Sequence, residues 1–143
     1  MLVSEILRGK GHEVATIERS ATIAQAAAAL AHHSIGALVV SSNGLTIEGI
    51  LSERDVVRSV SRRGAAGLDD PVEHAMTTDV VTCGLDATIE ELMVEMTQRR
   101  FRHVPVIDGG ALAGIVSIGD VVNSRVGELE AERQHLSNYI MGR

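Results

Sequence analysis

Apolar residues recur along the chain at two spacings, one typical of helices and one typical of strands. In two segments they lie three and four positions apart, which predicts a helix with one buried face for each: Ile23, Ala26, Ala27 and Leu30 in the first, and Ile89, Leu92, Met93 and Met96 in the second. Ser20 and Asp86 stand just ahead of these segments, so we expect them to be the N-caps.

Each predicted helix is followed by two short apolar strands joined by a turn. Asn43-Gly44 lies in the first turn and Asp108-Gly109-Gly110 in the second, and such residues supply the positive φ angles that tight hairpins need. A further short strand precedes each helix and is expected to end at Thr16 or Thr82. Another helix follows each hairpin at once. The order is therefore β-α-β-β-α, and it occurs twice.

The two copies also match residue by residue. Residues 20–40 align with residues 86–106 at an offset of 66, and GILSERDVV at 49–57 aligns with GIVSIGDVV at 114–122 at an offset of 65. Because one unit alone would leave a sheet face bare, we expect an α/β (α+β) fold of two tandem units packed about a pseudo-twofold axis. The expected segments are unit 1 at 1–60, a linker at 61–71, unit 2 at 72–126 and a C-terminal amphipathic helix extension at 127–143.

A tandem β-α-β-β-α unit that closes in Gly, two apolar residues, Ser-x-x-Asp and two more apolar residues resembles a CBS domain. The resemblance covers residues 3–126, so the chain is similar to a CBS domain pair. MTQRRFRHVPVID followed by GIVSIGDVV is similar to small stand-alone bacterial CBS-pair proteins and to the CBS module of IMP dehydrogenase. The resemblance implies clefts between the two units that hold AMP, ATP, NAD(H) or another adenosyl ligand.

Composition narrows the classes of partner. The formal net charge of −6 disfavours nucleic acid and anionic membranes as partners, and no apolar run reaches the eighteen residues of a membrane span. The single cysteine, Cys83, excludes an intrachain disulfide, and the N-terminus carries no signal-peptide pattern. We therefore expect a cytoplasmic protein. Because only 1% of residues are aromatic, the core must consist of Val, Ile, Leu and Ala.

The two Ser-x-x-Asp turns are the clearest candidate chemistry. Ser52 and Ser117 stand where a strand passes into a helix N-terminus, which favours anions, and Asp55 and Asp120 follow one helical turn later, suited to the two vicinal hydroxyls of a ribose. The alternative is structural, because serine is also a common N-cap and aspartate is favourable in a first turn. The duplication and the resemblance favour nucleotide binding.

The copies differ in the basic residues ahead of one strand. Arg102 and His103 occupy the positions of Gly36 and Ala37. Arg102 can grip a phosphate with two hydrogen bonds and His103 can donate another, and the resemblance pairs both with the Asp55 side. The alternative is a solvated helix end. The residues expected to contact the nucleotide are Thr16, Gly36, Ala37, Val39, Ser52, Arg54, Asp55, Thr82, Arg102, His103, Pro105, Ser117 and Asp120.

Other signals are weaker. Arg54 suits either a phosphate or a neighbouring acid. Lys10 lies in a Gly-Lys-Gly sequence that is not a P-loop, and a phosphate contact from it is left open. We expect no metal site, since His32-His33 has no partner at ligand spacing, and the serines form no nucleophile–base–acid set. The tail carries a stripe suited to a second subunit or to folding back on its own domain: Val122, Val126, Leu129, Leu136 and Ile140.

These observations predict a regulatory or sensor module, not an enzyme, which forms a homodimer and binds an adenosine nucleotide whose state an unknown effector protein reads. One alternative is a dimeric interaction scaffold that needs no ligand. Another is an enzyme accessory subunit.

Overall fold

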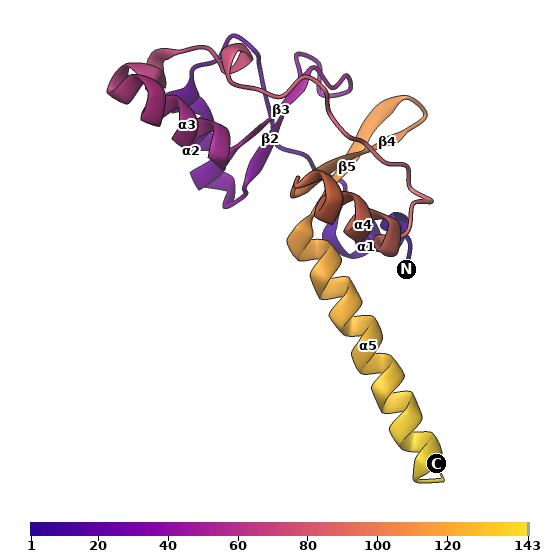
Figure 1. Ribbon diagram of the computed structural model, residues 1–143. Coiled ribbons are helices and arrows are strands. Elements are labelled where there is room, and N and C mark those ends of the chain that lie inside the picture. Colours follow the sequence, from indigo (N-terminus) through magenta and orange to yellow (C-terminus); the bar gives the residue numbers. More distant parts are fainter. Residues whose placement is uncertain (143) are drawn as a thin grey trace.

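The computed structural model describes residues 1–142 and places the two repeats side by side, with the last helix extending away from both (Figure 1). Its elements, in chain order, are α1 Val3–Lys10, β1 Thr16–Ile17, α2 Ile23–His33, β2 Ala37–Val40, β3 Gly49–Ser52, α3 Glu53–Arg63, the 3-10 helices η1 Gly64–Asp69 and η2 Val72–His74, α4 Ile89–Arg99, β4 His103–Asp108, β5 Ala111–Ser117 and α5 Ile118–Ile140. In the described part of the chain, no helix has both the length and the apolar character to cross a bilayer.

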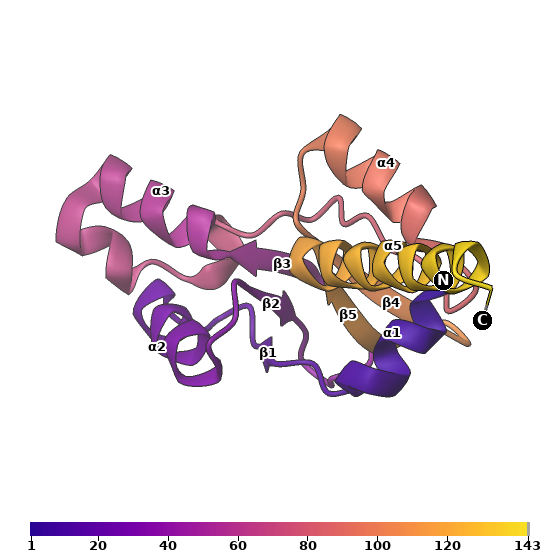
Figure 2. The ribbon, with the colours of Figure 1, turned by 90° about the horizontal axis from the view of Figure 1, so that it is seen from below.

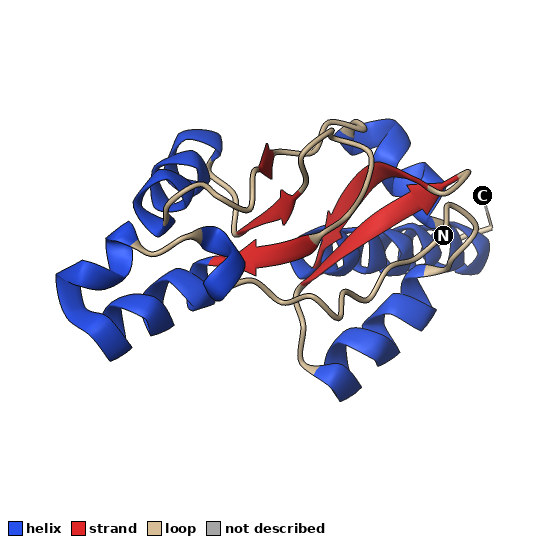
Figure 3. Ribbon diagram, turned by 90° about the horizontal axis from the view of Figure 1, so that it is seen from above, coloured by secondary structure: helices blue, strands red, loops and turns tan. Residues whose placement is uncertain are grey.

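The strands run through the middle of the molecule and the helices lie outside them (Figure 3). In the first repeat β1 pairs parallel to β2, and β2 pairs antiparallel to β3. In the second repeat β4 and β5 form an antiparallel pair, with a bulge between Val106 and Ile107. The predicted mixed architecture of two tandem β-α-β-β-α units is confirmed, with one shortened strand in the second unit.

The first strand of each repeat differs from the prediction. β1 begins at Thr16 rather than ending there. In the second repeat a single parallel bridge from Cys83 to Val106 replaces the strand expected to end at Thr82. Two backbone hydrogen bonds hold it, from Cys83 N to Pro105 O (3.1 Å) and from Ile107 N to Cys83 O (2.8 Å). The second repeat therefore has a single paired residue, Cys83, where the first repeat has the strand β1.

The helix caps also differ from the prediction. Thr22 and Thr88, not Ser20 and Asp86, are the N-caps of α2 and α4. Each threonine hydroxyl accepts a hydrogen bond from the third helical amide, at 3.1 Å and 3.2 Å. The side chain of that third residue, Gln25 or Glu91, accepts one from the threonine amide in return. This reciprocal pair satisfies two backbone donors, so the helices begin two residues later than expected.

The two hairpins are unequal. Gly109 and Gly110, both with positive φ, make the tight turn predicted between β4 and β5. Between β2 and β3 the prediction of a tight turn is wrong, because residues 41–48 form a longer loop. The Oδ1 atom of Asn43 accepts hydrogen bonds from two backbone amides of this loop, which holds it closed.

Each hydrophobic core contains a segment from the other half of the chain. α1, from the chain start, packs with α4, β4 and β5 in one core, and its Leu7 is fully buried there. Val72, from the second half, is buried in the core formed by α2, β2 and β3. Figure 2 shows α1 and α5 beside β4 and β5, with α2 and α3 at the other end. This reciprocal exchange ties the two repeats together.

Equivalent glycines permit the exchange. A Cβ atom on Gly114 would lie 2.7 Å from Leu7 Cδ1, and one on Gly49 would lie 2.7 Å from Met76 Sδ. Both distances are shorter than van der Waals contact, so a side chain at either position would displace the exchanged segment. The glycine that opens each GILS or GIVS motif is therefore explained by packing.

Candidate functional site

Both Ser-x-x-Asp turns are N-terminal caps in the folded protein. Asp55 Oδ2 accepts hydrogen bonds from Ser52 N (2.8 Å) and from Ser52 Oγ (3.1 Å). Asp120 Oδ2 accepts one from Ser117 N (2.9 Å), and Ser117 Oγ accepts one from Asp120 N (3.1 Å). The structural role considered for these residues is therefore real. It engages one carboxylate oxygen of each aspartate and leaves the other, Oδ1, for further contacts.

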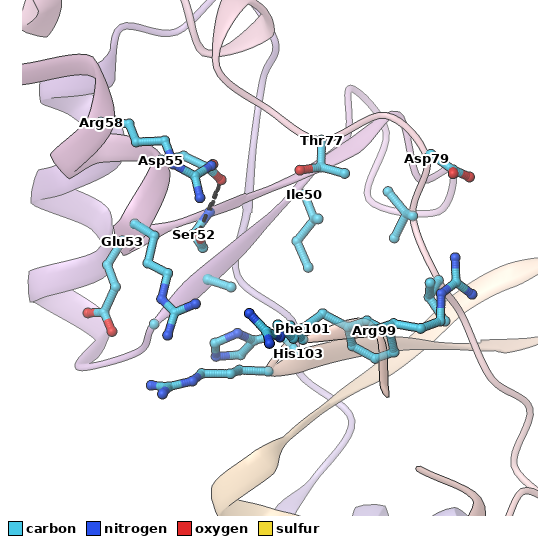
Figure 4. A pocket seen from close by; sticks show the side chains of 17 residues that line it. Ile50, Ser52, Glu53, Asp55, Arg58, Thr77, Asp79, Arg99, Phe101 and His103 are labelled. Carbon is cyan, nitrogen blue, oxygen red and sulfur yellow. Dashed lines mark hydrogen bonds and ion pairs between the residues drawn. The ribbon is translucent and has the colours of Figure 1, made fainter. Parts of the chain in front are cut away.

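The first turn opens into a cavity between the repeats, which we call the Asp55 cleft. Its volume is about 300 Å³, and its walls are the start of β2, the β3–α3 junction, the segment ahead of α4 and the start of β4. Figure 4 shows Asp55 and Ser52 on one side and His103, Phe101 and Arg99 on the other, with Ile50 between them and Thr77 next to Ile50. Asp55 itself is only 8% exposed, and its Oδ1 atom lies 3.5 Å from Arg58 Nη1.

The second Ser-x-x-Asp turn opens into a cavity of its own, which we call the Asp120 cleft. It is lined by Lys10, residues 13–15, residues 33–37, His103, Ile115, Ser117 and Asp120. These are the counterparts of the walls of the Asp55 cleft, because residues 13–15 take the place that residues 79–81 take in the first, at the offset of 66. The repeat in the sequence therefore produces two clefts.

His103 belongs to both clefts. A Cβ atom added to Gly36 would lie 3.1 Å from His103 Cε1 and Nε2, so the imidazole rests against the bare backbone of that glycine. Burial lowers the pKa of His103, and the carboxylate of Glu53 opposes this shift. The neutral ring is therefore favoured while the cleft holds no anion.

The two clefts differ in charge. The Asp55 cleft is lined by five arginines and three acids, which are Arg54, Arg58, Arg99, Arg100 and Arg102 against Glu53, Asp55 and Asp79. The Asp120 cleft is lined by one lysine and two acids, Lys10 against Glu13 and Asp120. With histidines neutral, the sums are +2 and −1. The first cleft therefore suits an anion and the second does not.

An internal cation engages the second aspartate. Lys10 Nζ donates hydrogen bonds to Asp120 Oδ2 and to Ile115 O. Burial by itself raises the pKa of Asp120, but the hydrogen bonds from Lys10 and Ser117 outweigh it and lower the pKa below its ordinary value. Lys10, considered above as a phosphate contact, instead forms an ion pair inside the Asp120 cleft.

The structure brings most of the predicted site residues together. The Asp55 cleft contains Gly36, Ala37, Ser52, Arg54, Asp55, Arg102 and His103. The Asp120 cleft contains Ser117 and Asp120 and shares Gly36, Ala37 and His103. Arg54 makes no ion pair with any residue in 1–142, so the neighbouring acid, one of the two alternatives left open for it, is not found in that range.

Four predicted residues lie outside both clefts. Val39 is fully buried and Pro105 is buried as well. Thr16 is exposed on β1, and Thr82 lines a separate hollow beside α4. Val39 and Pro105 lie two residues beyond Ala37 and His103 and share their strand faces, so they lie outside the clefts because of their position farther along the strand.

Several cleft residues were missed by the sequence reasoning. Thr77, Asp79 and Phe101 line the Asp55 cleft without any motif that marks them. Arg58 had a readable signal, since it follows Arg54 by four residues on the same helix and thus shares its face.

Neither the cysteine nor a cluster of metal-ligating side chains adds a reactive group to these clefts. Burial raises the pKa of Cys83 to about 11, so its thiol is protonated and weakly reactive. Among residues 1–142, no three His, Cys, Asp or Glu side chains are grouped closely enough to hold a metal ion.

Comparison with known proteins decides the family. The family model of the CBS domain matches residues 3–62 and again residues 72–127, one match for each repeat. The chain belongs to the CBS domain family. The resemblance carried by the two Ser-x-x-Asp turns is thereby confirmed, and this CBS domain pair has relatives with the same arrangement. The family is one of regulatory modules.

Three similar proteins carry the CBS domain in their names. The CBS-domain containing protein ATU1752 from Agrobacterium tumefaciens is 46% identical over 87% of this chain and 99% of that chain, with a TM-score of 0.85. The CBS domain-containing protein YhcV of Bacillus subtilis is 32% identical over 76% of this chain and 76% of that protein. The CBS domain protein PAE2072 from Pyrobaculum aerophilum, solved in complex with AMP, is 28% identical over 84% of this chain and 89% of that chain, with a TM-score of 0.75.

Proposed function

We propose that this CBS domain pair is a regulatory module that binds an adenosine nucleotide in the Asp55 cleft without altering it chemically. The observation that carries the proposal is that one cavity between the repeats has a carboxylate, Asp55, on one wall and the imidazole of His103 on the facing wall. The carboxylate can accept hydrogen bonds from a ribose, and the imidazole can donate one to a phosphate. The AMP complex of the Pyrobaculum aerophilum relative supports the ligand class. AMP, ATP and NAD(H) are the candidates, and no metal takes part.

The ribose end of the ligand is assigned to Asp55. Its Oδ2 atom is held by the Ser52 backbone and hydroxyl, so the carboxylate has a fixed orientation before any ligand arrives. Its Oδ1 atom faces only the 3.5 Å contact with Arg58 among the described residues, and it can accept from the two vicinal hydroxyls. A preorganised acceptor of this kind binds without an ordering cost.

The phosphate end is assigned to the opposite wall. Arg102 is exposed at the mouth of the cleft and Arg54 extends from the first turn of α3, and neither is neutralised by an acid within residues 1–142. His103 lines the same cavity. A phosphate held there would favour the charged imidazolium and reverse the effect of burial on its pKa.

The purine is assigned to the apolar surface of the same cavity. Ile50, Val81 and Phe101 are half-buried and line it, and they come from both repeats. A ligand that contacts all three walls therefore spans the boundary between the repeats. Its binding energy shifts the population toward the packing that fits it, and an effector protein that contacts both repeats reads this shift.

The Asp120 cleft is the weaker of the two nucleotide sites. Lys10 pairs with the Asp120 carboxylate through Oδ2, the oxygen that also caps the helix, and the cleft carries a net charge of −1 against +2 in the first, by the residues named above. We therefore assign one high-affinity nucleotide to each chain.

The protein is also proposed to form a homodimer through α5. Most of this helix extends beyond the body (Figure 1), and five apolar residues on it are 46–74% exposed: Val122, Val126, Leu129, Leu136 and Ile140. With Arg133, they occupy the a and d positions of a heptad pattern, which is the seam of a two-stranded coiled coil. The stripe lies about a quarter of a turn from Val121, which is buried against the body, so a second copy has access to it.

Charge favours the parallel arrangement of the two helices. In a parallel pair, Arg133 at its a position lies beside Glu132 of the other copy at a g position. In an antiparallel pair that aligns Leu129 with Arg133, Glu130 meets Glu130 and Glu132 meets Glu132. We therefore assign a second copy of this chain, in parallel, as the occupant of the seam.

The function is tested by thermal unfolding of dialysed protein with AMP, ADP, ATP, NAD and GTP, and by calorimetric titration of each ligand. A ligand at a hundred times its dissociation constant adds about 2.7 kcal/mol to the free energy of unfolding. For a chain of this size that raises the melting temperature by roughly 5–10 °C. The adenosine ligands are expected to do so and GTP is not. Unchanged melting with every nucleotide would overturn the proposal in favour of a ligand-independent scaffold, whereas a chemically altered nucleotide after long incubation would favour an enzyme.

A further inference from the structure

Cations are concentrated on one part of this acidic protein. Of its thirteen lysines and arginines, seven line either the Asp55 cleft or a second hollow next to it: Arg54, Arg58, Arg62, Arg63, Arg99, Arg100 and Arg102. The chain as a whole has a formal net charge of −6. This concentration exceeds what a single phosphate of a mononucleotide requires.

The second hollow continues the Asp55 cleft along α3. It has a volume of about 490 Å³ and lies between α3 and the segment that contains Asp70 and His74. Asp55 and Arg58 line both cavities, so the two are adjacent. We call this second cavity the α3 hollow.

An arginine row connects the two cavities. Arg54, Arg58 and Arg62 are four residues apart and thus share one face of α3, over a rise of about 12 Å. Like charges at this spacing destabilise a helix by a few tenths of a kcal/mol per pair. The row is therefore a cost to the fold unless an anion binds to it.

Acids of the chain neutralise only part of this charge. Arg63 Nε lies 2.7 Å from Asp70 Oδ2, and Arg58 makes the longer contact with Asp55. Within residues 1–142, Arg54 and Arg62 have no ion-pair partner. Both ends of the row thus present an unneutralised guanidinium, one at the mouth of the Asp55 cleft and one in the α3 hollow.

The second repeat shows that the fold does not need the row. At the offset of 65 residues, the counterparts of Arg54, Arg58 and Arg62 on α5 are Gly119, Asn123 and Gly127. None of these is charged, although α5 begins with the same Ser-x-x-Asp cap and continues as a helix. The row is thus a property of the Asp55 side alone.

We propose that the row and the α3 hollow hold a polyphosphate chain, so that the Asp55 cleft selects adenosine polyphosphates over AMP. The inference rests on the proposed function. The ribose stays on Asp55, the first phosphate lies near Arg54, and the later phosphates follow Arg58 toward Arg62. A single-stranded nucleic acid presents the same phosphates, but the negative net charge of the whole chain disfavours a ligand that extends past the basic area.

The experiment measures AMP, ADP and ATP affinities by calorimetry for the full chain, for Arg62→Gln and for Arg8→Gln as the matched control. Arg62 is exposed and unpaired within residues 1–142, and Arg8 is an exposed arginine on α1 that lines neither cavity. The wild type is expected to bind ATP at least about tenfold more tightly than AMP. Arg62→Gln is expected to weaken ATP binding about fivefold, as for an exposed charge contact of about 1 kcal/mol, with AMP within twofold. Arg8→Gln changes neither, and inorganic tripolyphosphate competes with ATP in the wild type but only weakly in Arg62→Gln.

The outcomes separate this inference from the function on which it rests. If AMP binds and ATP gains nothing, or if Arg62→Gln weakens AMP and ATP equally, the inference is wrong and nucleotide binding stands. If neither AMP nor ATP binds, both are wrong. Tighter binding of single-stranded oligoadenylate than of ATP, lost in Arg62→Gln, would overturn the inference in favour of a nucleic-acid surface.

Discussion

Asp55→Asn separates the capping role of this aspartate from ligand binding. Asparagine has the same shape, and its Oδ1 atom can still accept the hydrogen bond from Ser52 N that Asp55 now accepts at 2.8 Å. What it loses is the negative charge. A hydrogen bond to a charged group contributes about 1.5–3 kcal/mol, against about 0.5–1.5 kcal/mol for a neutral one. Two ribose hydroxyls therefore lose about 1 kcal/mol each, or about 2 kcal/mol together.

That loss corresponds to roughly 30-fold weaker binding of AMP, measured by isothermal titration calorimetry. Asp120→Asn is the matched control, because Lys10 already occupies the equivalent carboxylate, and it is expected to change AMP affinity by less than about threefold. Melting temperatures of both variants check that the caps survive. The reasoning is refuted if Asp55→Asn binds AMP like the wild type, or if Asp120→Asn weakens it just as much.

Three further predictions concern assembly and stability. Leu129→Lys together with Leu136→Lys is expected to convert the dimer into a monomer in light scattering, because it places like charges at two d positions of the seam. Gly67→Ala is expected to lower the free energy of unfolding by about 1–3 kcal/mol in urea titrations, because its Cβ would collide with the backbone carbonyl of Ser59. Since burial lowers the pKa of His103, the unfolded chain binds more protons just below pH 6.5, so melting temperature falls on acidification there. His103→Gln is expected to reduce that fall between pH 8 and pH 5.5.

Each of these three predictions has a matched control variant. Val57→Lys changes an apolar residue on α3 that is 67% exposed and should leave the dimer intact; a monomer would instead locate the interface on α3. Gly127→Ala, on α5, meets no atom within 4 Å and should stabilise by up to about 1 kcal/mol. His135→Gln should keep the acid sensitivity of the wild type. Equal behaviour of Gly67→Ala and Gly127→Ala, or of the two histidine variants, would contradict the explanations given.

The candidate site was only partly predictable. The Ser-x-x-Asp turns and the basic residues ahead of β4 could be identified because their chemistry lies within a few residues of a helix or strand end. Thr16, Thr82, Val39 and Pro105 were expected at the ligand, yet all four lie outside both clefts. Val39 and Pro105 share a strand face with the cleft residues Ala37 and His103, but how far along the strand each cleft extends depends on the packing of the two repeats.

The repeat, the order of its elements, the family and the two capped turns could all be predicted from the sequence, because they depend on residues close together in the chain. The entry of α1 into the second core, the contact of Lys10 with Asp120 across 110 residues and the position of Arg62 next to the Asp55 cleft are visible only in the folded protein. Contacts at such separations depend on how the two repeats pack, and two nearly equal units have the same local pattern whichever segments they exchange. The copies share their pattern but differ in their charged residues, so that packing gathers five arginines around the Asp55 cleft and places the Lys10–Asp120 ion pair in the other.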